Sequence, residues 1–336
     1  MTSPKESSSA DDTSAGATTA SAERVRPEPI KAVPVRHPGR WVAVAVIVVL
    51  AAMFVNMLLT NPAFNWSFMF DHMFRDPILE GAWTSIKMTV LAMIVGVGLG
   101  IVAAVMRLSA NPVLSTVAWL YTWFFRAIPR FVLLILCGNL GILYAQFEIG
   151  LPFDRQIGDL LGIDLNGRIF GVDANDFLTA FVAGLIGLAL SEGAYMAEIV
   201  RAGIQSVDPG QAEAAQALGM SRGRAMRRIV LPQAMRVIVP PTGNETIAML
   251  KDTSLLAAIP LAELFFQLRA VGTRTFQVFP MLVSACLWYL ALSSVLMIGQ
   301  YFLERYFGRG FGTATRTRVR TMGINASQSK GSAAAG

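Results

Sequence analysis

Charged side chains are scarce in this chain. They make up 15% of its 336 residues, whereas hydrophobic residues make up 54%. A soluble domain carries roughly a quarter charged residues, because its surface has to be hydrated. The composition therefore excludes a soluble globular protein and predicts a chain that lies in a lipid bilayer.

Residue types that build catalytic and metal sites are also few. The chain has two histidines, His37 and His72, and two cysteines, Cys137 and Cys286, which both fall in apolar stretches. It contains no G-x-x-x-x-G-K-[ST] segment, the loop whose backbone N–H groups cradle phosphates. We therefore expect no catalytic residues, no metal ion and no bound cofactor. The protein is not expected to be an enzyme, and any ATP that drives it must be bound and hydrolysed by a partner subunit.

Six stretches are predicted to cross the membrane, because about 20 helical residues span roughly 30 Å of hydrocarbon. A fifth stretch, less uniform than the four strongly apolar ones, is expected to begin near Ile128 and to run to residue 147, with Pro129 in its first turn. Trp119, Tyr121 and Trp123 then lie at the membrane surface. The four strongly apolar stretches are 41–60, 83–106, 177–200 and 278–303.

The sixth predicted span, 237–259, contains Glu245, Lys251 and Asp252. Ionised groups are costly in hydrocarbon, so this segment must face protein or water and not lipid. The expected fold is all-α, a polytopic helical bundle in the membrane.

The arginines and lysines predict the orientation of these spans, since basic residues near span ends favour the cytoplasm. Most lie in one set of loops, together with both termini, and few lie in the other set. The tail 1–40 is expected to be disordered and cytoplasmic, because it has too few apolar residues to form a core. The basic tail 306–336 and the loop 204–235 are expected on the same side. We read the excess of 28 Lys+Arg over 22 Asp+Glu as this asymmetry and not as a nucleic-acid binding surface.

The loop 204–235 contains the sequence EAAQALGMSRGRAMRRIVLP and predicts a helix, a glycine turn and a second helix. Asp208 is a good N-cap for a helix over 209–218, and Gly219 can adopt the left-handed conformation that ends it. Ser221 can cap the second helix, and Pro232 is expected to end it. The small side chains of Ala214, Ala215 and Ala217 leave a surface of low relief on the first helix, which another protein could approach closely. Glu213 is the single charged contact on this surface.

Three interpretations of this loop are open from the residues alone. It can be an ordinary amphipathic loop, a docking module for a cytoplasmic protein, or a DNA-binding helix-turn-helix with a basic second helix. The last is disfavoured because both ends run directly into predicted spans, which leaves no room for the third helix that such a domain needs.

The spacing of E-A-A, three residues, G, nine residues and I-x-L-P resembles the EAA loop of permease subunits in binding-protein-dependent ABC importers. The matching positions are Glu213, Ala214, Ala215, Gly219, Ile229, Leu231 and Pro232. The flanks GAYMAEIVRAGIQSVDPGQ and PQAMRVIVPPTGNETIAMLKDTSLLAAI are similar to the polar amino-acid branch of that family. The resemblance covers residues 80–305 and implies a five-span permease domain, to which 41–60 adds an extra N-terminal span.

The resemblance also implies partners. In that family the loop forms a coupling helix that fits a cleft on a cytoplasmic ATP-binding cassette subunit. A separate extracytoplasmic solute-binding protein and a second permease subunit, identical or homologous, complete the importer. The chain departs from the family in its extra span and in FRAIPRFVLL, where the branch has an RGTPLL-like segment that Ala127 and Arg130 do not match.

The predicted function is thus ATP-driven import of a polar amino acid across the cytoplasmic membrane. The alternative is a gradient-driven secondary amino-acid transporter, which also places ionisable residues in its spans.

A substrate path is predicted from depth in the membrane. At 1.5 Å per residue, Glu192 lies about 16 Å and Glu245 about 14 Å from the cytoplasmic ends of their spans. Asp252 shares a helix face with Glu245, and Asn244 and Lys251 share the adjacent face. The acids can receive a substrate's ammonium, and Lys251 or a helix N-terminus can receive its carboxylate. Alternatively, these groups satisfy one another or the backbone near Pro240 and Pro241.

Overall fold

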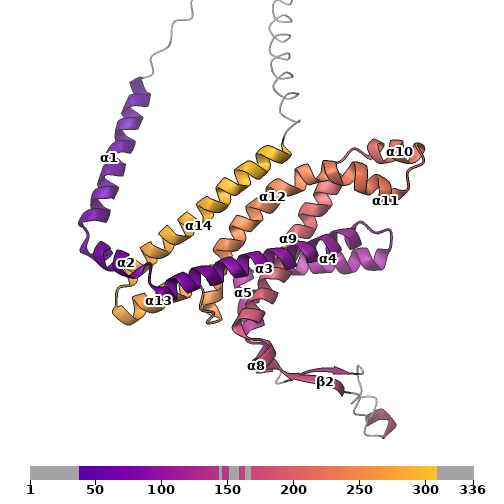
Figure 1. The fold of residues 1–336 in the computed structure, drawn as a ribbon, viewed down its shortest axis with the longest axis horizontal. Helices are drawn as coiled ribbons and strands as arrows, with labels where there is room; N and C mark the ends of the chain where they lie inside the picture. The colour runs from indigo at the N-terminus through magenta and orange to yellow at the C-terminus, as the bar shows by residue number, and fades with distance from the viewer. Residues whose placement is uncertain (1–37, 144–145, 151–158, 163–167, 309–336) are drawn as a thin grey trace, which may run out of the picture. The chain divides into compact units, whose positions relative to one another are not determined.

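A computed structural model describes residues 38–143, 146–150, 159–162 and 168–308 of the chain. The predicted tails therefore lie outside the described residues, apart from 38–40 and 306–308. The chain divides into two units, Met1–Leu58 and Leu59–Gly336. In chain order the elements (Figure 1) are α1 (Pro38–Thr60), η1 (Pro62–Phe64), α2 (Trp66–His72), α3 (Asp76–Arg107), α4 (Pro112–Ala127), α5 (Arg130–Gly138), α6 (Leu140–Leu143), β1 (Gln146–Gly150), β2 (Arg168–Asp173), α8 (Ala174–Phe177), α9 (Ala180–Gln205), α10 (Pro209–Ala217), α11 (Arg222–Ala225), η2 (Met226–Val230), α12 (Leu231–Asp252), η3 (Thr253–Ala258), α13 (Leu264–Thr275) and α14 (Val278–Phe307).

The first unit contains nearly all of α1, which covers the predicted extra span. Its large apolar side chains, Trp41 and Phe54 among them, are exposed. None of the most apolar window of this helix is buried. A helix that is apolar on every face and uncovered suits direct contact with lipid.

Three helices of the second unit, α3, α9 and α14, are also long and apolar enough to cross a membrane. They cover the other three strongly apolar stretches of the sequence. With α1 this makes four candidate spans among the described residues, or five if the bent pair α4 and α5 forms one span. The predicted helical membrane bundle is confirmed, whereas the predicted count of six spans is not.

The fifth predicted span, from Ile128 to residue 147, is wrong. The helix α4 already contains Trp119, Tyr121 and Trp123, and it meets α5 at an angle of 99°. Ile128 is extended, with φ −86° and ψ 131°, because the ring of Pro129 disfavours a helical conformation in the residue before it. A new helix then begins at Arg130 and lasts only nine residues.

The sixth predicted span corresponds to α12 followed by the 3₁₀ turn η3. Among the described helices, α12 is long but does not reach the apolarity of a candidate span, as its charged residues lead one to expect. The helix continues through Pro240 and Pro241 without a break. This segment lies against α9 and α14, so much of its surface faces protein.

A small antiparallel hairpin, β1 and β2, was not predicted. Gln146 pairs with Asp173 and Phe147 with Val172, and the register shifts between Ile149 and Gly150. In Figure 1 this hairpin and the pair α10 and α11 lie at opposite ends of α9. The hairpin is therefore an addition to a helical fold.

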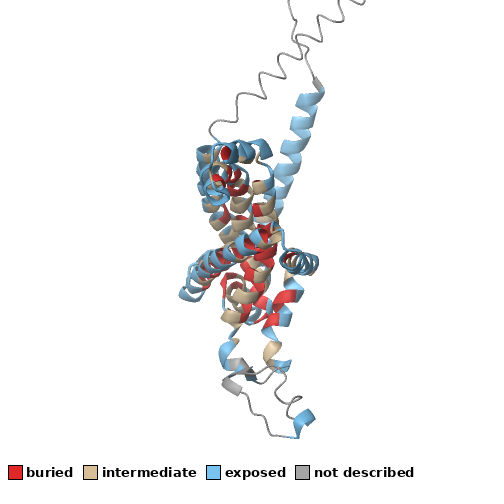
Figure 2. Ribbon diagram, turned by 90° about the vertical axis from the view of Figure 1, so that its right-hand side faces the viewer, coloured by how far each residue is buried: buried red, intermediate tan, exposed pale blue. Residues whose placement is uncertain are grey.

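The core of the second unit forms where α3 and α9 cross, with α5 and α12 packed against α9. The buried residues concentrate in the middle of the bundle (Figure 2). Small residues allow the close approach of α3 and α9: a Cβ added at Gly96 would lie 2.8 Å from Cβ of Glu192. Such contacts are typical of membrane helices, which associate by close packing because lipid is as apolar as the helices. The central cluster consists of Met88, Ala92, Met93, Leu134, Leu188, Met249, Leu256, Ile259 and Leu261.

Candidate functional site

The first candidate site is the loop between α9 and α12. The Asp208 carboxylate accepts a hydrogen bond of 2.8 Å from the Gly210 N–H, and Pro209 follows as the first helical residue. Pro lacks the N–H that would be unsatisfied at this position and has the right φ, so both residues favour a helix start. The predicted helix over 209–218 is confirmed as α10, Pro209–Ala217.

Gly219 ends α10 in the predicted way. Its φ is +79°. The Met220 N–H donates to the Ala215 carbonyl at 3.0 Å, and the Gly219 N–H donates to the Gln216 carbonyl at 2.9 Å. These two bonds form a Schellman motif, which requires a left-handed residue and so favours glycine.

The second helix of the loop does not end at Pro232 as predicted. Ser221 is the N-cap of α11 by position, although its side chain makes no capping hydrogen bond. The helical path then continues through the π turn η2 into α12, where Pro232 lies in the first turn. Proline is tolerated there because the π turn already changes the hydrogen-bond pattern. The loop thus has no separate recognition helix of the kind that DNA-binding domains insert into a groove.

The exposed surface of α10 differs from the predicted one. Glu213, Ala214 and Ala217 are exposed, whereas Ala215 is only 2% exposed and packs inward. Leu218, which follows the helix, is 84% exposed. Sequence reasoning missed Leu218; its position directly before the turn glycine, on the outer side of α10, was the available signal. Of the other motif positions, Ile229 and Leu231 are partly buried and Pro232 is exposed.

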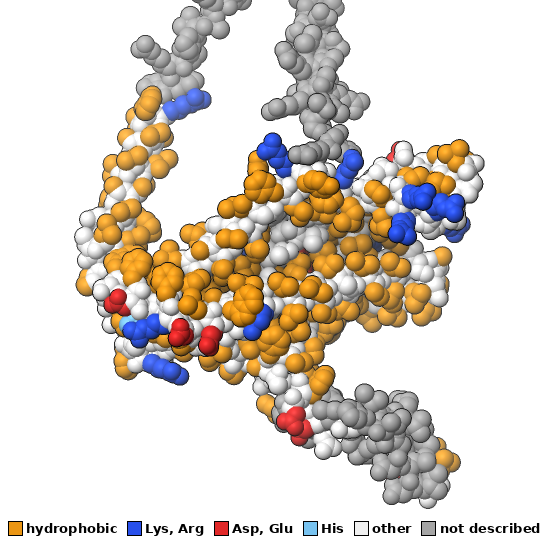
Figure 3. All heavy atoms as spheres, viewed as in Figure 1, with side chains coloured by type: hydrophobic (Ala, Val, Ile, Leu, Met, Phe, Trp, Pro, Cys, Tyr) orange, Lys and Arg blue, Asp and Glu red, His pale blue; other side chains and the backbone are white. Residues whose placement is uncertain are grey.

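Basic side chains lie beside this surface. Arg222, Arg224, Arg227 and Arg228 are all exposed on α11 and η2. Figure 3 shows them as a group next to α10. The loop therefore presents two acidic residues, Asp208 at the start of α10 and Glu213 on it, together with a few small or apolar side chains and a basic flank.

The second candidate site is a charge cluster centred on Arg130, the first residue of α5. Its Nη2 donates to Glu192 Oε2 on α9 at 3.0 Å, and its Nη1 donates to Asp252 Oδ2 on α12 at 2.5 Å. Glu245 Oε2, also on α12, lies 3.6 Å from Nη2. The structure thus brings together three of the five predicted substrate-path residues. We call Arg130, Glu192, Glu245 and Asp252 the acid cluster.

The guanidinium of Arg130 has two further contacts, with Ser191 and with the ring of Tyr195. Its Nε donates to Ser191 Oγ at 3.1 Å, and its Cζ lies 4.9 Å from the centre of the Tyr195 ring. Among the acids, the side chain of Glu192 is fully buried, whereas those of Glu245 and Asp252 are 26% and 31% exposed. The cluster therefore has one closed side, at Glu192, and one open side.

The other two predicted residues lie apart from the cluster. Asn244 is exposed, and its Oδ1 accepts a hydrogen bond of 2.9 Å from Gln300 on α14. Lys251 is exposed, and the ion pairs of the three acids go to Arg130 instead. The expectation that Lys251 receives a substrate's carboxylate stays a prediction. Arg130 was missed, although a lone arginine entering an apolar helix is itself a signal of a buried partner.

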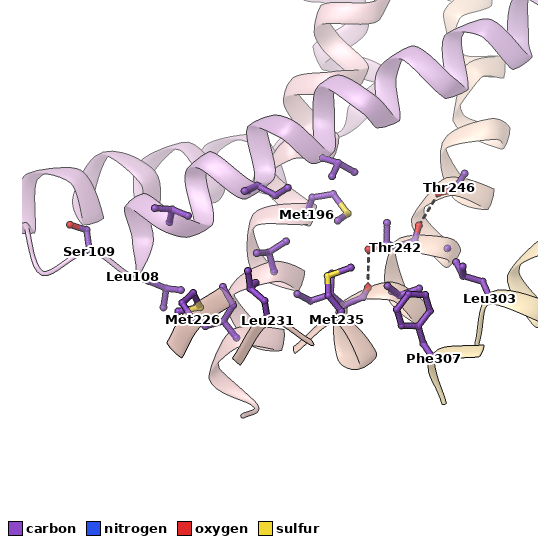
Figure 4. A pocket seen from close by; sticks show the side chains of 18 residues that line it. Leu108, Ser109, Met196, Met226, Leu231, Met235, Thr242, Thr246, Leu303 and Phe307 are labelled. Carbon is purple, nitrogen blue, oxygen red and sulfur yellow. Dashed lines mark hydrogen bonds between the residues drawn. The ribbon is translucent and has the colours of Figure 1, made fainter. Parts of the chain in front are cut away.

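A large cavity of about 970 Å³ lies between α3, α9, α12 and α14. Its lining is almost entirely apolar, as Figure 4 shows for Met196, Met235 and Phe307. Thr242 and Thr246 contribute hydroxyls, but the Thr246 hydroxyl is already bonded to the Thr242 carbonyl at 2.9 Å. The acid cluster does not line this cavity. Within the described ranges, no group of three or more His, Cys, Asp or Glu side chains is arranged to hold a metal ion.

A third polar group is buried near the start of α13. Glu263 is the N-cap of this helix, and its carboxylate accepts hydrogen bonds from the backbone N–H groups of Phe265 at 2.9 Å and Phe266 at 2.6 Å. The hydroxyls of Ser85 on α3 and Tyr289 on α14 donate to the same carboxylate at 3.2 Å and 3.0 Å. All its contacts are donors from this chain, so we read Glu263 as a structural residue.

Comparison with known proteins places these features in context. Residues 96–309 match the family described as binding-protein-dependent transport system inner membrane component. The arginine transport system permease protein ArgU of Corynebacterium glutamicum is 48% identical over 297 residues, which cover 88% of each chain. The probable glutamine ABC transporter permease protein GlnM of Bacillus subtilis is 30% identical over 74% of this chain and 100% of its own.

Solved structures of ABC transporters also match the fold of this chain. A crystal structure of an amino acid ABC transporter with histidines matches with a TM-score of 0.54 and 31% identity, over 68% of this chain and 94% of its own. An inward-facing MetNI methionine ABC transporter matches with a TM-score of 0.50 at 17% identity, over 69% of this chain and 96% of its own, which supports the fold alone.

Proposed function

The chain belongs to the family of inner membrane components of binding-protein-dependent transport systems, and from this premise we propose that it carries a polar amino acid inward, driven by a separate ATPase. Family membership excludes the alternative of a gradient-driven secondary transporter. The names of the relatives differ in the amino acid, arginine in one and glutamine in another, so they do not select a single substrate.

The shape of α10 carries the proposal that this loop couples transport to ATP hydrolysis. Ala215 packs inward and holds the helix to the protein, while Glu213, Ala214 and Leu218 face outward. A projecting short helix with small side chains and one apolar tip suits a cleft on another protein. The cleft belongs, in our proposal, to an ATP-binding cassette subunit, and movement of that cleft is passed to α9 and α12 through the two ends of the loop.

This assignment sets the orientation of the chain. If α10 docks on a cytoplasmic subunit, the four exposed arginines beside it are cytoplasmic too, as the distribution of basic residues favours. The hairpin, at the other end of α9, then faces outward, where we place the solute-binding protein. Both termini are cytoplasmic in this arrangement.

A second permease subunit is part of the proposal. Many large apolar side chains of α3, α4 and α14 are exposed, including Ile94, Trp123 and Phe302. Lipid can cover them, but exposed faces of several neighbouring helices also provide a surface for an identical or homologous permease. The substrate would pass the acid cluster, whose open side is formed by Glu245 and Asp252.

The test of coupling uses Glu213→Lys and Gly219→Val. The first reverses the only charge on the outer face of α10, and the second places a β-branched residue at φ +79°, which disrupts the end of the helix. In proteoliposomes with the ATPase and loaded binding protein, both variants should lose most stimulated ATP hydrolysis while keeping normal membrane yield.

Two substitutions serve as controls. Glu80→Lys reverses an exposed charge on α3, and Gly299→Val adds a side chain on α14 where a Cβ meets nothing within 4 Å. Both should keep stimulated hydrolysis. If the two loop variants hydrolyse ATP as well as these controls do, α10 is not the coupling helix.

A further inference from the structure

The acid cluster carries more negative charge than its one cation can balance. Three carboxylates and one guanidinium sum formally to −2, and the ion pairs of all three acids go to Arg130. Unbalanced charge is expensive where water is scarce. The arrangement therefore favours the entry of a further positive charge.

Two carboxylates have unused capacity to bind that charge. Glu192 Oε1 is buried and has no hydrogen-bond partner, although the other oxygen of the same carboxylate bonds to Arg130. Glu245 Oε2 lies 3.6 Å from Arg130, which is too far for a hydrogen bond. A buried carboxylate oxygen without a donor is rare in folded proteins, so this oxygen points to a ligand.

Arg130 is poorly placed to bind a substrate itself. Each of its three nitrogens already has a partner, in Ser191, Asp252 and Glu192, and one face of the guanidinium lies on Tyr195. To receive a substrate carboxylate, Arg130 would have to release Glu192 or Asp252, and a released Glu192 would remain buried without a cation.

We propose, resting on the function proposed above, that the free oxygens of Glu192 and Glu245 bind the cationic group of a basic amino acid during import, and that Arg130 is the resident counter-ion of this site. The net charge of the amino acid determines which substrates this site favours. A basic amino acid brings +1 and lowers the formal excess from −2 to −1. A zwitterion leaves the excess unchanged, and an acidic amino acid increases it.

The experiment compares arginine with citrulline, which has nearly the same shape and the same α-amino and α-carboxylate groups but an uncharged side chain. Full-length permease is purified without the binding protein, whose own preference would hide that of the permease. The apparent Tm is measured against ligand concentration, since a ligand that binds the folded protein raises it. Arginine should half-saturate this shift at a concentration about tenfold lower than citrulline, which corresponds to about 1.4 kcal/mol.

Substitution of Glu245 gives the sharpest test, because Glu245 makes no hydrogen bond in the cluster and its loss disturbs the fold least. Glu245→Gln should raise the half-saturating concentration of arginine about tenfold and leave that of citrulline unchanged. The matched control is Glu198→Gln on α9, whose carboxylate pairs with Arg201 at 2.6 Å, outside the cluster. Glu198→Gln should give the same half-saturating concentrations of arginine and citrulline as the unmodified protein.

Arg130→Gln separates the two roles that the arginine can have. Removal of a counter-ion leaves a more negative site. The preference for arginine over citrulline, measured as the ratio of their half-saturating concentrations, should then increase about tenfold. A receptor for the α-carboxylate, once removed, should weaken both ligands by the same factor. That second result would overturn the proposal, as would equal binding of arginine and citrulline to the unmodified protein.

An inorganic cation could supply the same charge. The titration is therefore repeated with choline chloride and then sodium chloride at equal ionic strength. Stabilisation by sodium that is lost in Glu245→Gln, without any preference for arginine over citrulline, would assign the site to a metal cation and overturn the proposal. Failure of the ATPase experiment on α10 leaves this titration unaffected, since neither ATPase nor binding protein takes part in it.

Discussion

At Gly96 a hydrogen atom stands where any other residue would place a carbon 2.8 Å from Cβ and Cγ of Glu192. The Glu192 side chain of α9 is therefore packed directly against α3 at this glycine. One glycine on α3 thus helps to position an acid on α9. The side chain of Glu192 is fully buried as a result.

Gly96→Ala should therefore disturb both packing and the acid cluster. The added methyl group must push α9 away or shift Glu192, and overpacking of this kind costs about 1–3 kcal/mol. We expect a lower apparent Tm and, at matched yield, slower uptake of basic amino acids. The control is Gly98→Ala on the same helix, where an added Cβ meets nothing within 4 Å. The Tm of this variant should equal that of the unmodified protein or be slightly higher, because alanine favours the helix more than glycine does. Equal Tm values for the two variants would contradict the packing argument.

At the scale of elements, the ends of helices determine where this chain changes direction. Pro129 separates α4 from α5 and produces the bend of 99° that places Arg130 at the start of a new helix. Gly219 ends α10, and Glu263 starts α13. The cap at Glu263 also joins helices, because its carboxylate accepts bonds from Ser85 on α3 and Tyr289 on α14.

Glu263→Gln tests this cap. An amide has only one acceptor oxygen, so at least one of the two backbone N–H groups at Phe265 and Phe266 loses its partner in a buried place. An unsatisfied buried donor costs about 1–3 kcal/mol. The apparent Tm should fall accordingly. Glu304→Gln on α14, whose exposed carboxylate accepts a bond from Gln300, should leave the Tm unchanged. A similar Tm for both variants would show that Glu263 does not stabilise α13.

At the scale of the whole molecule, the chain exposes apolar surface over most of its helices. Figure 3 shows this surface on α14 and α3. The buried polar groups of the described residues are few, and most have partners within the chain. Among them, the buried side-chain atoms without a hydrogen-bond partner are Glu192 Oε1, Arg107 Nε, Ser284 Oγ and Ser293 Oγ. This distribution fits a membrane subunit whose polar interactions are reserved for the substrate path and for the ends of the bundle.

Deletion of residues 2–35 should leave uptake within about twofold of the full chain, because the composition of this tail does not support a folded domain. The deletion keeps Arg36 and Arg40, the basic residues that we expect to orient the first span. Uptake in proteoliposomes at matched reconstitution is the measurement. A deletion that also removes 36–60 serves as comparison and should lower the membrane yield. Loss of uptake in the shorter deletion, at normal yield, would assign a binding role to the tail.

Local chemistry in the sequence determined much of this protein. Long apolar runs identify α1, α3, α9 and α14, because hydrocarbon selects for them directly. Asp208, Pro209 and Gly219 set both ends of α10 through interactions within a few residues. Such features need no knowledge of distant parts of the chain.

Tertiary structure alone decided which side chains meet. Arg130 lies 62 residues from Glu192 and 122 from Asp252 in sequence, and only the bend at Pro129 and the packing of α5 on α9 bring it to them. The sequence placed Glu192 and Glu245 at similar depth, but sequence reasoning did not identify Arg130 as the cation between them. Helical periodicity relates residues of one helix, whereas the partner of a buried charge is set by how separate helices pack.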